Sequence, residues 1–256
     1  MRSLGWLRLP MVVTYVFLYL PILVLVVLSF NASKQPFTWG GFSTKWYAEL
    51  AGNAEVLQGL GNTLIVAVGA TVLSTALGTL LAVGLHRHSK SNLLDAYALV
   101  PAILPDLVLG IGLLVLFTLV SMTLGLYSVL LAHVVFGMAF VTAVVRARLT
   151  QVDPSLEEAS RDLGAGQVST FLRITVPGLM PAIVAGALLA FTLSLDEFVI
   201  AFFTNGPSSP TLPIVIYSMV RFGVTPEINA LASILMLVSF TAVISAQRLT
   251  RLTDTV

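Results

Sequence analysis

Residues 62–85 read NTLIVAVGATVLSTALGTLLAVGL and contain no charged side chain. A helix needs about 20 apolar residues to cross the hydrocarbon core of a bilayer, so this stretch is long enough to span a membrane. Five further stretches of similar character lie at 11–30, 97–120, 126–145, 178–203 and 228–246. The sequence therefore predicts an all-α integral membrane protein with six transmembrane helices, which form a single domain over residues 1–256.

The composition agrees with a chain embedded in lipid. Hydrophobic residues make up 57% of the sequence and charged residues 10%, whereas soluble domains carry about 25% charged residues. The net charge of +1 and the lack of long basic runs exclude a large nucleic-acid interface. The absence of cysteine excludes disulfides, iron–sulfur clusters and thiolate metal sites. We therefore expect the lipid bilayer, and no nucleic acid, as a partner.

The basic residues predict the orientation of the chain. With the N-terminus inside the cell, ten of the 13 Lys and Arg residues lie on the cytoplasmic side, and they are Arg2, Arg8, Arg87, Lys90, Arg146, Arg148, Arg161, Arg173, Arg248 and Arg251. Lys34, Lys45 and Arg221 remain outside. Cytoplasmic loops retain positive charge, so both termini are expected in the cytoplasm. A cleaved signal peptide is the alternative for 11–30, but no A-x-A site follows it.

Small side chains recur every four residues along two of the predicted helices. The two ridges consist of Ala70, Ser74, Gly78 and Ala82, and of Ala182, Gly186, Ala190 and Ser194. Helices in lipid associate through close packing of small residues, so we expect both ridges to form packed seams. Chance spacing in a chain rich in small residues is the alternative.

The longest predicted cytoplasmic segment, 146–177, carries the signals of a short helix. Asp153 is a good N-cap, Pro154 suits the first helical position, and Glu157 and Glu158 place negative charge where the helix dipole favours it. Four residues share one face of this helix, and they are Leu156, Ala159, Ser160 and Leu163.

Gly164 follows where a left-handed helix cap would stand. A second short helix is expected over 167–175, and Pro177 is expected to bar its continuation. This helix-turn-helix between the fourth and fifth spans would form a compact knob, residues 153–175, suited to docking into a partner's groove. A merely solvated connection between the two spans is the alternative.

The knob carries a recognisable motif. The motif has the pattern E-A-A, then three residues, G, nine residues and I-x-L-P. Its positions are occupied here by Glu158, Ala159, Ser160, Gly164, Ile174, Val176 and Pro177. Two of these depart from the pattern, with Ser160 in place of Ala and Val176 in place of Leu. This resembles the loop of type I ABC importer permeases that docks on the ATP-hydrolysing subunit. The resemblance implies that Glu158 makes a polar contact to the ATPase, that Leu163 docks through apolar contact and that Gly164 forms the turn.

The likeness extends over nearly the whole chain. The stretches SLDEFVIA at 194–201, TLPI at 211–214 and PEINA at 226–230 are most similar to the spermidine/putrescine permeases. Permeases for iron, sulfate or phosphonates share parts of this architecture, so they remain alternative assignments. The sequence does not separate spermidine from putrescine.

The resemblance also implies partners. The chain lacks G-x-x-x-x-G-K-[ST], so we expect it to bind no nucleotide or other cofactor and to be no enzyme by itself. ATP and magnesium would instead bind to two ABC ATPase subunits. A homologous sister permease and an extracytoplasmic solute-binding protein would complete an importer in the bacterial inner membrane, working by alternating access.

Three acids lie within the predicted spans, namely Asp106, Asp196 and Glu197. Ionisable groups inside lipid are costly, so each is a candidate for the substrate pathway, and a cationic substrate such as a polyamine is the economical partner. Neighbours on a helix point about 100° apart, so Asp196 and Glu197 cannot both line one narrow path unless the helix breaks there, and we favour Asp196 as the pathway-facing residue. Protonation or a contact with a neighbouring subunit is the alternative, and Asp106 could brace the bend at Pro101 and Pro105.

No catalytic set is evident in the sequence. His133 is interpreted as a hydrogen-bonding packing residue, and His86 with His88 lack the nearby carboxylates that a metal site would need. An intramembrane enzyme and an ATPase-independent channel or carrier remain as alternatives, and only the motif of the knob argues against the second of these.

Overall fold

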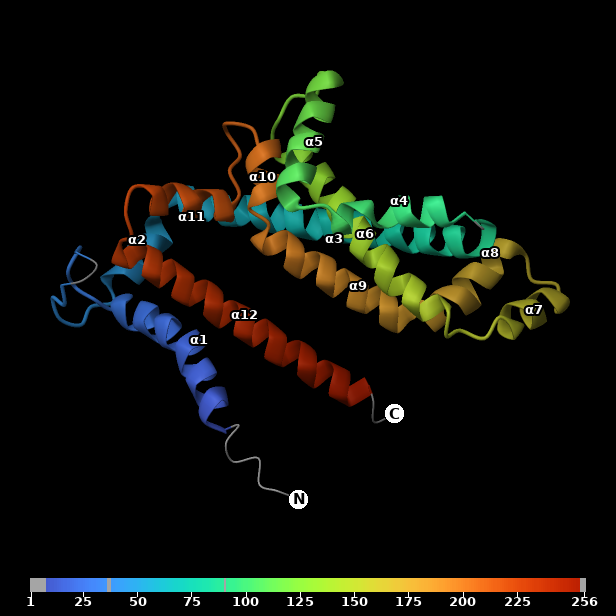
Figure 1. Cartoon of the computed structure of the whole chain (residues 1–256), viewed down its shortest axis with the longest axis horizontal. Helices are drawn as coiled ribbons and strands as arrows, with labels where there is room; N and C mark the ends of the chain where they lie inside the picture. The colour runs from blue at the N-terminus through green and yellow to red at the C-terminus, as the bar shows by residue number, and fades with distance from the viewer. Residues whose placement is uncertain (1–7, 36–37, 90, 254–256) are drawn as a thin grey trace. The chain divides into compact units, whose positions relative to one another are not determined.

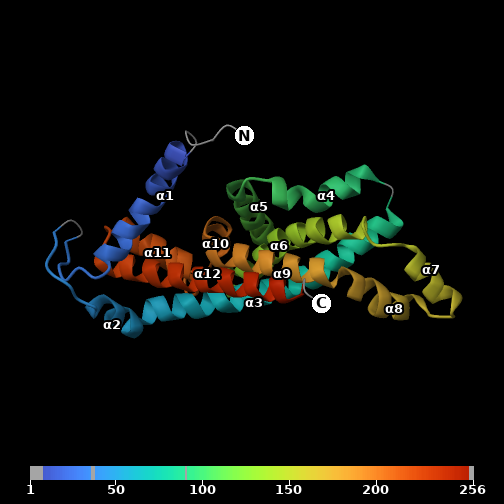
Figure 2. The same ribbon diagram turned by 90° about the horizontal axis from the view of Figure 1, so that it is seen from below.

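The computed structural model describes residues 8–35, 38–89 and 91–253 (Figures 1 and 2). The helices of this part are, in order, α1 (Arg8–Leu28), α2 (Lys45–Gly52), α3 (Ala54–His88), α4 (Asn92–Ile103), α5 (Asp106–Leu119), α6 (Leu126–Leu149), α7 (Ser155–Asp162), α8 (Gln167–Thr170), α9 (Val176–Asp196), α10 (Val199–Thr204), α11 (Leu212–Arg221) and α12 (Pro226–Thr253). A π-helical stretch, Phe171–Thr175, joins α8 to α9. The β-pairing among the described residues is one isolated bridge between Asn31 and Phe42, so the all-α prediction is confirmed.

Several helices are long and apolar enough to cross a membrane. Four of them pass by length and composition, namely α1, α3, α6 and the continuous helix Gln167–Asp196. The bent pair α4 and α5 would make a fifth span. The described apolar part of α12 is shorter, at Pro226–Val238. A multi-span membrane protein is therefore confirmed, whereas the count of six spans stays a prediction.

The stretch 97–120 is a broken helix, although we expected one span. The pair α4 and α5 is bent by 105° at its break. Leu104 at the break has extended backbone angles, φ −63° and ψ 140°. Proline disfavours helical angles in the residue before it, so Pro105 forces this break. The third predicted span thus turns sharply where Asp106 begins α5.

The stretch 178–203 is also broken, contrary to the prediction of one helix. The helix α9 ends at Asp196, and Glu197 takes an extended conformation with ψ 105°. The carboxylate of Glu197 accepts a hydrogen bond from the backbone N–H of Ile200 at 2.9 Å. This bond satisfies a free N–H in the first turn of α10, as an acidic side chain does at a helix start.

The prediction that Pro177 bars the helix is wrong. One helix runs from Gln167 to Asp196, with Pro177 in the first turn of α9. A proline inside a helix clashes with the carbonyl four residues earlier, which here belongs to Arg173. Arg173 lies in the π-helical stretch, whose wider turn gives that carbonyl room. The predicted start of this helix at 167 is confirmed.

The described chain divides into two compact units, one within residues 58–215 and the other made of the segments on either side. In the second unit α12 packs on α1 and on α2. Asn31 is fully buried there, and its carbonyl accepts a hydrogen bond from Trp46 Nε1 at 2.7 Å. A single domain over residues 1–256 stays a prediction.

Both small-residue ridges pack against α6, which confirms the predicted seams. A Cβ added at Gly78 of α3 would lie 2.9 Å from Val141 side-chain atoms, and one at Gly186 of α9 would lie 3.5 Å from the Val141 Cα. Gly137 faces Ser74 on one side and Ala190 on the other. The helix α6 thus packs against both α3 and α9, and the knob follows the C-terminal end of α6.

Candidate functional site

The knob starts with a capped helix. The Asp153 carboxylate accepts a hydrogen bond from the backbone N–H of Ser155 at 2.9 Å, and this bond holds the pKa of the Asp153 carboxyl below its usual range. The helix α7 begins at Ser155, so Pro154 stands immediately before the first helical residue rather than at it. A short helix is present as predicted, but its N-cap residue is Pro154 and not Asp153, whose carboxylate satisfies the first helical N–H from one residue earlier.

Gly164 ends α7 in the left-handed conformation that the sequence predicted, with φ at +86°. The backbone N–H of Ala165 donates to the carbonyl of Ser160 at 3.1 Å, and the N–H of Gly164 donates to the carbonyl of Arg161 at 2.8 Å. These two bonds form a Schellman motif, which satisfies the last carbonyls of the helix. The chain therefore reverses within a few residues.

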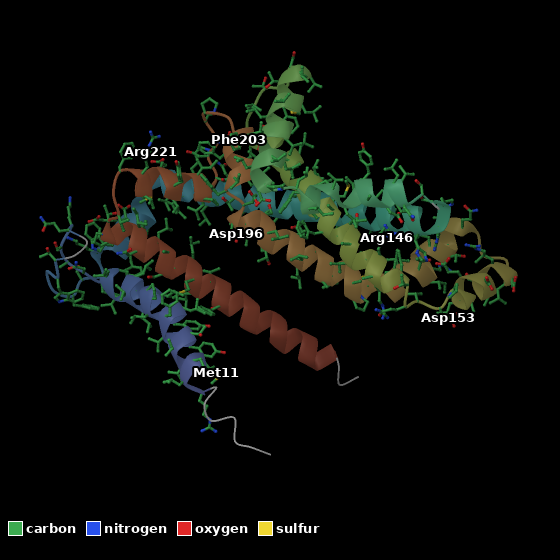
Figure 3. All side chains as sticks on the ribbon, in the orientation of Figure 1. Met11, Arg146, Asp153, Asp196, Phe203 and Arg221 are labelled. Carbon is green, nitrogen blue, oxygen red and sulfur yellow. The ribbon has the colours of Figure 1, made fainter. Side chains whose placement is uncertain are left out.

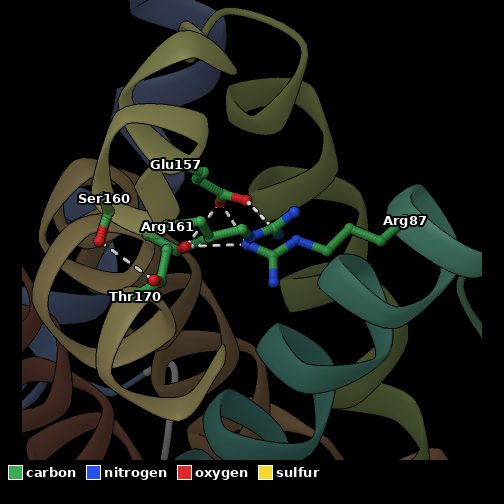
Figure 4. A network of polar contacts seen from close by, with 6 residues as sticks. Arg87, Glu157, Ser160, Arg161 and Thr170 are labelled. Carbon is green, nitrogen blue, oxygen red and sulfur yellow. Dashed lines mark hydrogen bonds and ion pairs between the residues drawn. The ribbon is translucent and has the colours of Figure 1, made fainter. Parts of the chain in front are cut away.

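The predicted face of α7 lines an open groove. The groove has a volume of about 350 Å³ and is lined by Leu156, Ala159, Ser160, Leu163, Ala165, Ser169, Arg173 and Ile174. A hydrogen bond of 3.1 Å between Ser160 Oγ and Thr170 Oγ1 ties α7 to α8 across its base (Figure 4). Leu163 at its rim is 89% exposed. An exposed leucine beside a fixed groove is suited to contact with another protein.

Glu158, the predicted polar contact, lies away from this internal bonding. It is exposed, and its carboxylate has no partner among the described residues. Pro177 is also exposed, whereas Ile174 is half-buried in the groove wall. Glu158 is therefore free to pair with a partner's donor.

The neighbouring Glu157 makes the contacts that hold the knob in place, and the sequence did not indicate this role. Its carboxylate pairs with Arg87 from the end of α3 and accepts a hydrogen bond from Thr175 Oγ1 at 2.6 Å (Figure 4). Arg87 also donates to Thr175 Oγ1 at 2.8 Å, and Arg161 lies 3.6 Å from the other carboxylate oxygen. The one available signal was Arg87 at the end of the apolar stretch 62–85, where it served only in the count of basic residues.

The three acids of the predicted pathway differ in exposure. Glu197 is 8% exposed and holds the start of α10, whereas Asp196 and Asp106 are exposed. The helix α10 packs on α5, with Ile200 beside Gly110, so the break after α9 and the α4–α5 bend place Glu197 and Asp106 near the starts of two helices in contact. Figure 3 labels Asp196 at the end of α9.

The three histidines lie in two different environments. His133 is buried, and its Nδ1 shares a hydrogen bond of 2.7 Å with Ser194 Oγ on α9, which confirms its interpretation as a hydrogen-bonding packing residue. His86 and His88 line a pocket of about 470 Å³ between the ends of α3, α6 and α7. The described residues contain no group of three or more His, Cys, Asp or Glu side chains placed to hold a metal ion. The basic residues Arg2 and Lys90 lie outside the described residues.

The sequence matches a family of membrane proteins over most of its length. The family of binding-protein-dependent transport system inner membrane components matches residues 74–254. This range includes α4 to α10, and with them the knob and the three acids.

Two similar relatives come from Escherichia coli (strain K12). The spermidine/putrescine transport system permease protein PotC is 42% identical over 243 residues, which cover 94% of this chain and 92% of PotC. The putrescine transport system permease protein PotI is 42% identical over 240 residues, which cover 90% of this chain and 85% of PotI. The similarity to both therefore extends over almost the whole of each chain.

A solved structure has the same fold. It is described as a bacterial ABC transporter involved in the import of the acidic polysaccharide alginate, and it superimposes with a TM-score of 0.74 over 97% of this chain and 94% of that chain. The two sequences are 17% identical, so the similarity concerns the fold alone.

Proposed function

The chain belongs to the family of binding-protein-dependent transport system inner membrane components, and we propose that it is the permease subunit of an ABC importer for polyamines. Family membership confirms the resemblance drawn from the motif in the knob. The observation that carries the substrate class is the 42% identity, over nearly the full length, to the relatives named for spermidine and putrescine transport. The substrate is then a small aliphatic cation with two or more ammonium groups.

The knob is the surface that we assign to the ATPase. Its support is geometric, because a capped helix, a Schellman turn and a groove present Leu163 and Glu158 outward from a fixed base. The docking residues in this proposal are Glu158, Ala159, Ser160, Leu163, Gly164, Ile174 and Pro177. Two ATPase subunits, binding ATP and magnesium, would drive one such knob on this chain and one on a homologous sister permease.

Orientation and span number complete the proposal. The knob is cytoplasmic with both termini inside, as the distribution of Lys and Arg favours. Six spans follow if the bent pair α4 and α5 and the helix α12 each cross once.

An extracytoplasmic solute-binding protein would then deliver the solute to the outer face. This chain would bind no nucleotide, and the complex, not the chain, would hydrolyse ATP.

The acidic residues are proposed as contacts of the substrate pathway. We take Glu197 as the leading residue of the three, because the Ile200 N–H holds its carboxylate in one orientation and Asp106 and Asp196 lie on the adjoining helices α5 and α9. A cationic solute passing this region would neutralise part of the acidic charge gathered there. Asp106 and Asp196, both exposed, would contact the cation from either side.

The test of this function is the solute that drives the complex. The chain is co-expressed with its sister permease, ATPase and solute-binding protein, and the complex is reconstituted in proteoliposomes. We expect the binding protein loaded with spermidine or putrescine to stimulate ATP hydrolysis and solute uptake, with the empty binding protein as the control. Stimulation by iron, sulfate or a phosphonate, without stimulation by polyamines, would overturn the substrate class but not the family.

A further inference from the structure

We propose that Arg87 is a positioning residue for energy coupling, which links the knob to α3 through Glu157 and Thr175. This inference rests on the proposed function and deepens it, because it adds α3 to the helices that move with the knob. Chain connectivity alone joins the knob to α6 and to α9. The helix α3 precedes both in sequence and has no covalent route to the knob except through α6.

The three side chains form a closed ring, which we call the Arg87 ring. Glu157 comes from α7, Thr175 from the π-helical stretch and Arg87 from the last turn of α3. Each group contacts both others, because the Thr175 hydroxyl donates to Glu157 and accepts from Arg87, which also pairs with Glu157. Hydrogen bonds in such a network strengthen one another and act as a unit.

Burial distinguishes the Arg87 ring from an ordinary surface ion pair. Thr175 is 1% exposed, and the Arg87 and Glu157 side chains are 25% and 18% exposed. Pairs this far removed from solvent are less screened than exposed ones. The contact of Glu157 with Arg161, by comparison, is longer at 3.6 Å and involves an arginine that is 53% exposed. Arg87, not Arg161, is therefore the cation that fixes Glu157.

The position of the ring gives it a mechanical role. It joins the first turns of α7, beside the docking groove, to a helix whose small-residue ridge packs against α6 in the membrane. A displacement of the knob that an ATPase produces would then pull on α3 directly. Without the ring, ATP hydrolysis would still move α6 and α9, but α3 would follow only through side-chain packing.

Arg87 and Glu157 of the ring line the pocket of about 470 Å³ that His86, His88 and Asp153 also line. The open space beside it leaves room for the exchange of one charged side chain for another. The pair can therefore be reversed, with Arg87→Glu combined with Glu157→Arg, without filling a packed core. This makes a charge-reversal experiment feasible.

The experiment measures the solute taken up per ATP hydrolysed by the complete reconstituted complex, with radiolabelled spermidine or putrescine as the probe. We expect Arg87→Ala and Arg87→Glu to lower this ratio by about tenfold, because interaction energies between residues of one network are typically of that size. The ATPase should still copurify with both variants. The double variant Arg87→Glu/Glu157→Arg is expected to recover most of the ratio. A role in folding alone would change the yield of the complex but not the ratio.

A matched control is the cytoplasmic ion pair between Arg146 and Asp95, at 2.8 Å and with similar exposure, which joins α6 to α4 and leaves the knob untouched. We expect Arg146→Ala to keep the wild-type ratio. A wild-type ratio in Arg87→Ala, or no recovery in the reversed pair when both single variants are impaired, would overturn this inference alone. No polyamine uptake by the wild-type complex would overturn the proposed function and this inference together.

Discussion

The carbonyl oxygen of Ser160 accepts a hydrogen bond from the backbone N–H of Ala165 at 3.1 Å, across the turn that Gly164 makes with φ at +86°. This bond fixes the angle at which α7 leaves the rest of the knob. It depends on a backbone conformation that residues with a Cβ adopt only at a cost. The turn is thus the part of the knob most sensitive to a single substitution.

Replacing Gly164 tests the turn. A Cβ at this position meets no neighbouring atom within 4 Å, so the penalty of Gly164→Val comes from the backbone conformation and is about 1–2 kcal/mol. We expect the ATPase to copurify less well while the apolar helices remain folded. Gly166→Val is the matched control, since Gly166 also has open space but an ordinary φ of −70°. Equal loss in both variants would contradict the role of the turn.

Leu163 should contribute to ATPase affinity without contributing to the stability of the permease. It is 89% exposed, so Leu163→Ser removes little buried surface from the free chain. In the complex the substitution should weaken binding of the ATPase by about tenfold, as loss of one apolar anchor does. The control is Phe222→Ser, an equally exposed residue in the other unit. The measurement is the amount of ATPase retained on immobilised permease.

The seam between α3 and α6 can be tested with two glycines of the same helix. At Gly78 a Cβ would lie 2.9 Å from the Met138 carbonyl, whereas at Gly84 it would meet nothing within 4 Å. Gly78→Leu should therefore destabilise the protein by about 1–3 kcal/mol through overpacking. Gly84→Leu should not lower stability, and thermal unfolding of the purified chain in detergent compares the two. A lower melting temperature in Gly84→Leu alone would show that the seam is misplaced.

Loss of the Glu197 charge should impair uptake. The amide of Glu197→Gln can still accept the Ile200 N–H through its oxygen, so the start of α10 should stay intact. A cationic solute would lose its contact with this charge, so we expect the transport KM to rise by about tenfold. A tenfold change corresponds to about 1.4 kcal/mol of binding free energy. Glu49→Gln, at an exposed acid in the other unit, is the control. Unchanged uptake in Glu197→Gln with a defect in Asp196→Asn would return the pathway role to Asp196.

Local signals predicted the local features of this protein well. Gly164 indicated a turn, because few other residues tolerate a positive φ. Asp153 indicated the start of a helix, because its carboxylate can accept a hydrogen bond from a free N–H of the first turn. The ridges around Gly78 and Gly186 predicted packed seams, because small residues at regular helical spacing allow two helices in lipid to approach closely.

Features that depend on distant parts of the chain were not predictable in the same way. The motif singles out Glu158, but no local signal indicates the role of Glu157, because the arginine that pairs with it lies 70 residues earlier. The expectation for Pro177 failed because a π-helical stretch upstream absorbed the clash. Only one of Asp196 and Glu197 was expected to face the pathway because an unbroken helix was assumed, whereas α9 ends at Asp196 and Glu197 is extended.

The length of α3 exceeds the thickness of the bilayer core. Its 35 residues rise about 50 Å, whereas the hydrocarbon core is about 30 Å thick. In the proposed orientation the uncharged stretch 62–85 occupies the core, so most of the surplus lies on the outer side and only the last turn, with Arg87, emerges into the cytoplasm. The Arg87 ring would then lie at the level of the lipid headgroups, so an ATPase bound to the knob would act on α3 close to the membrane surface.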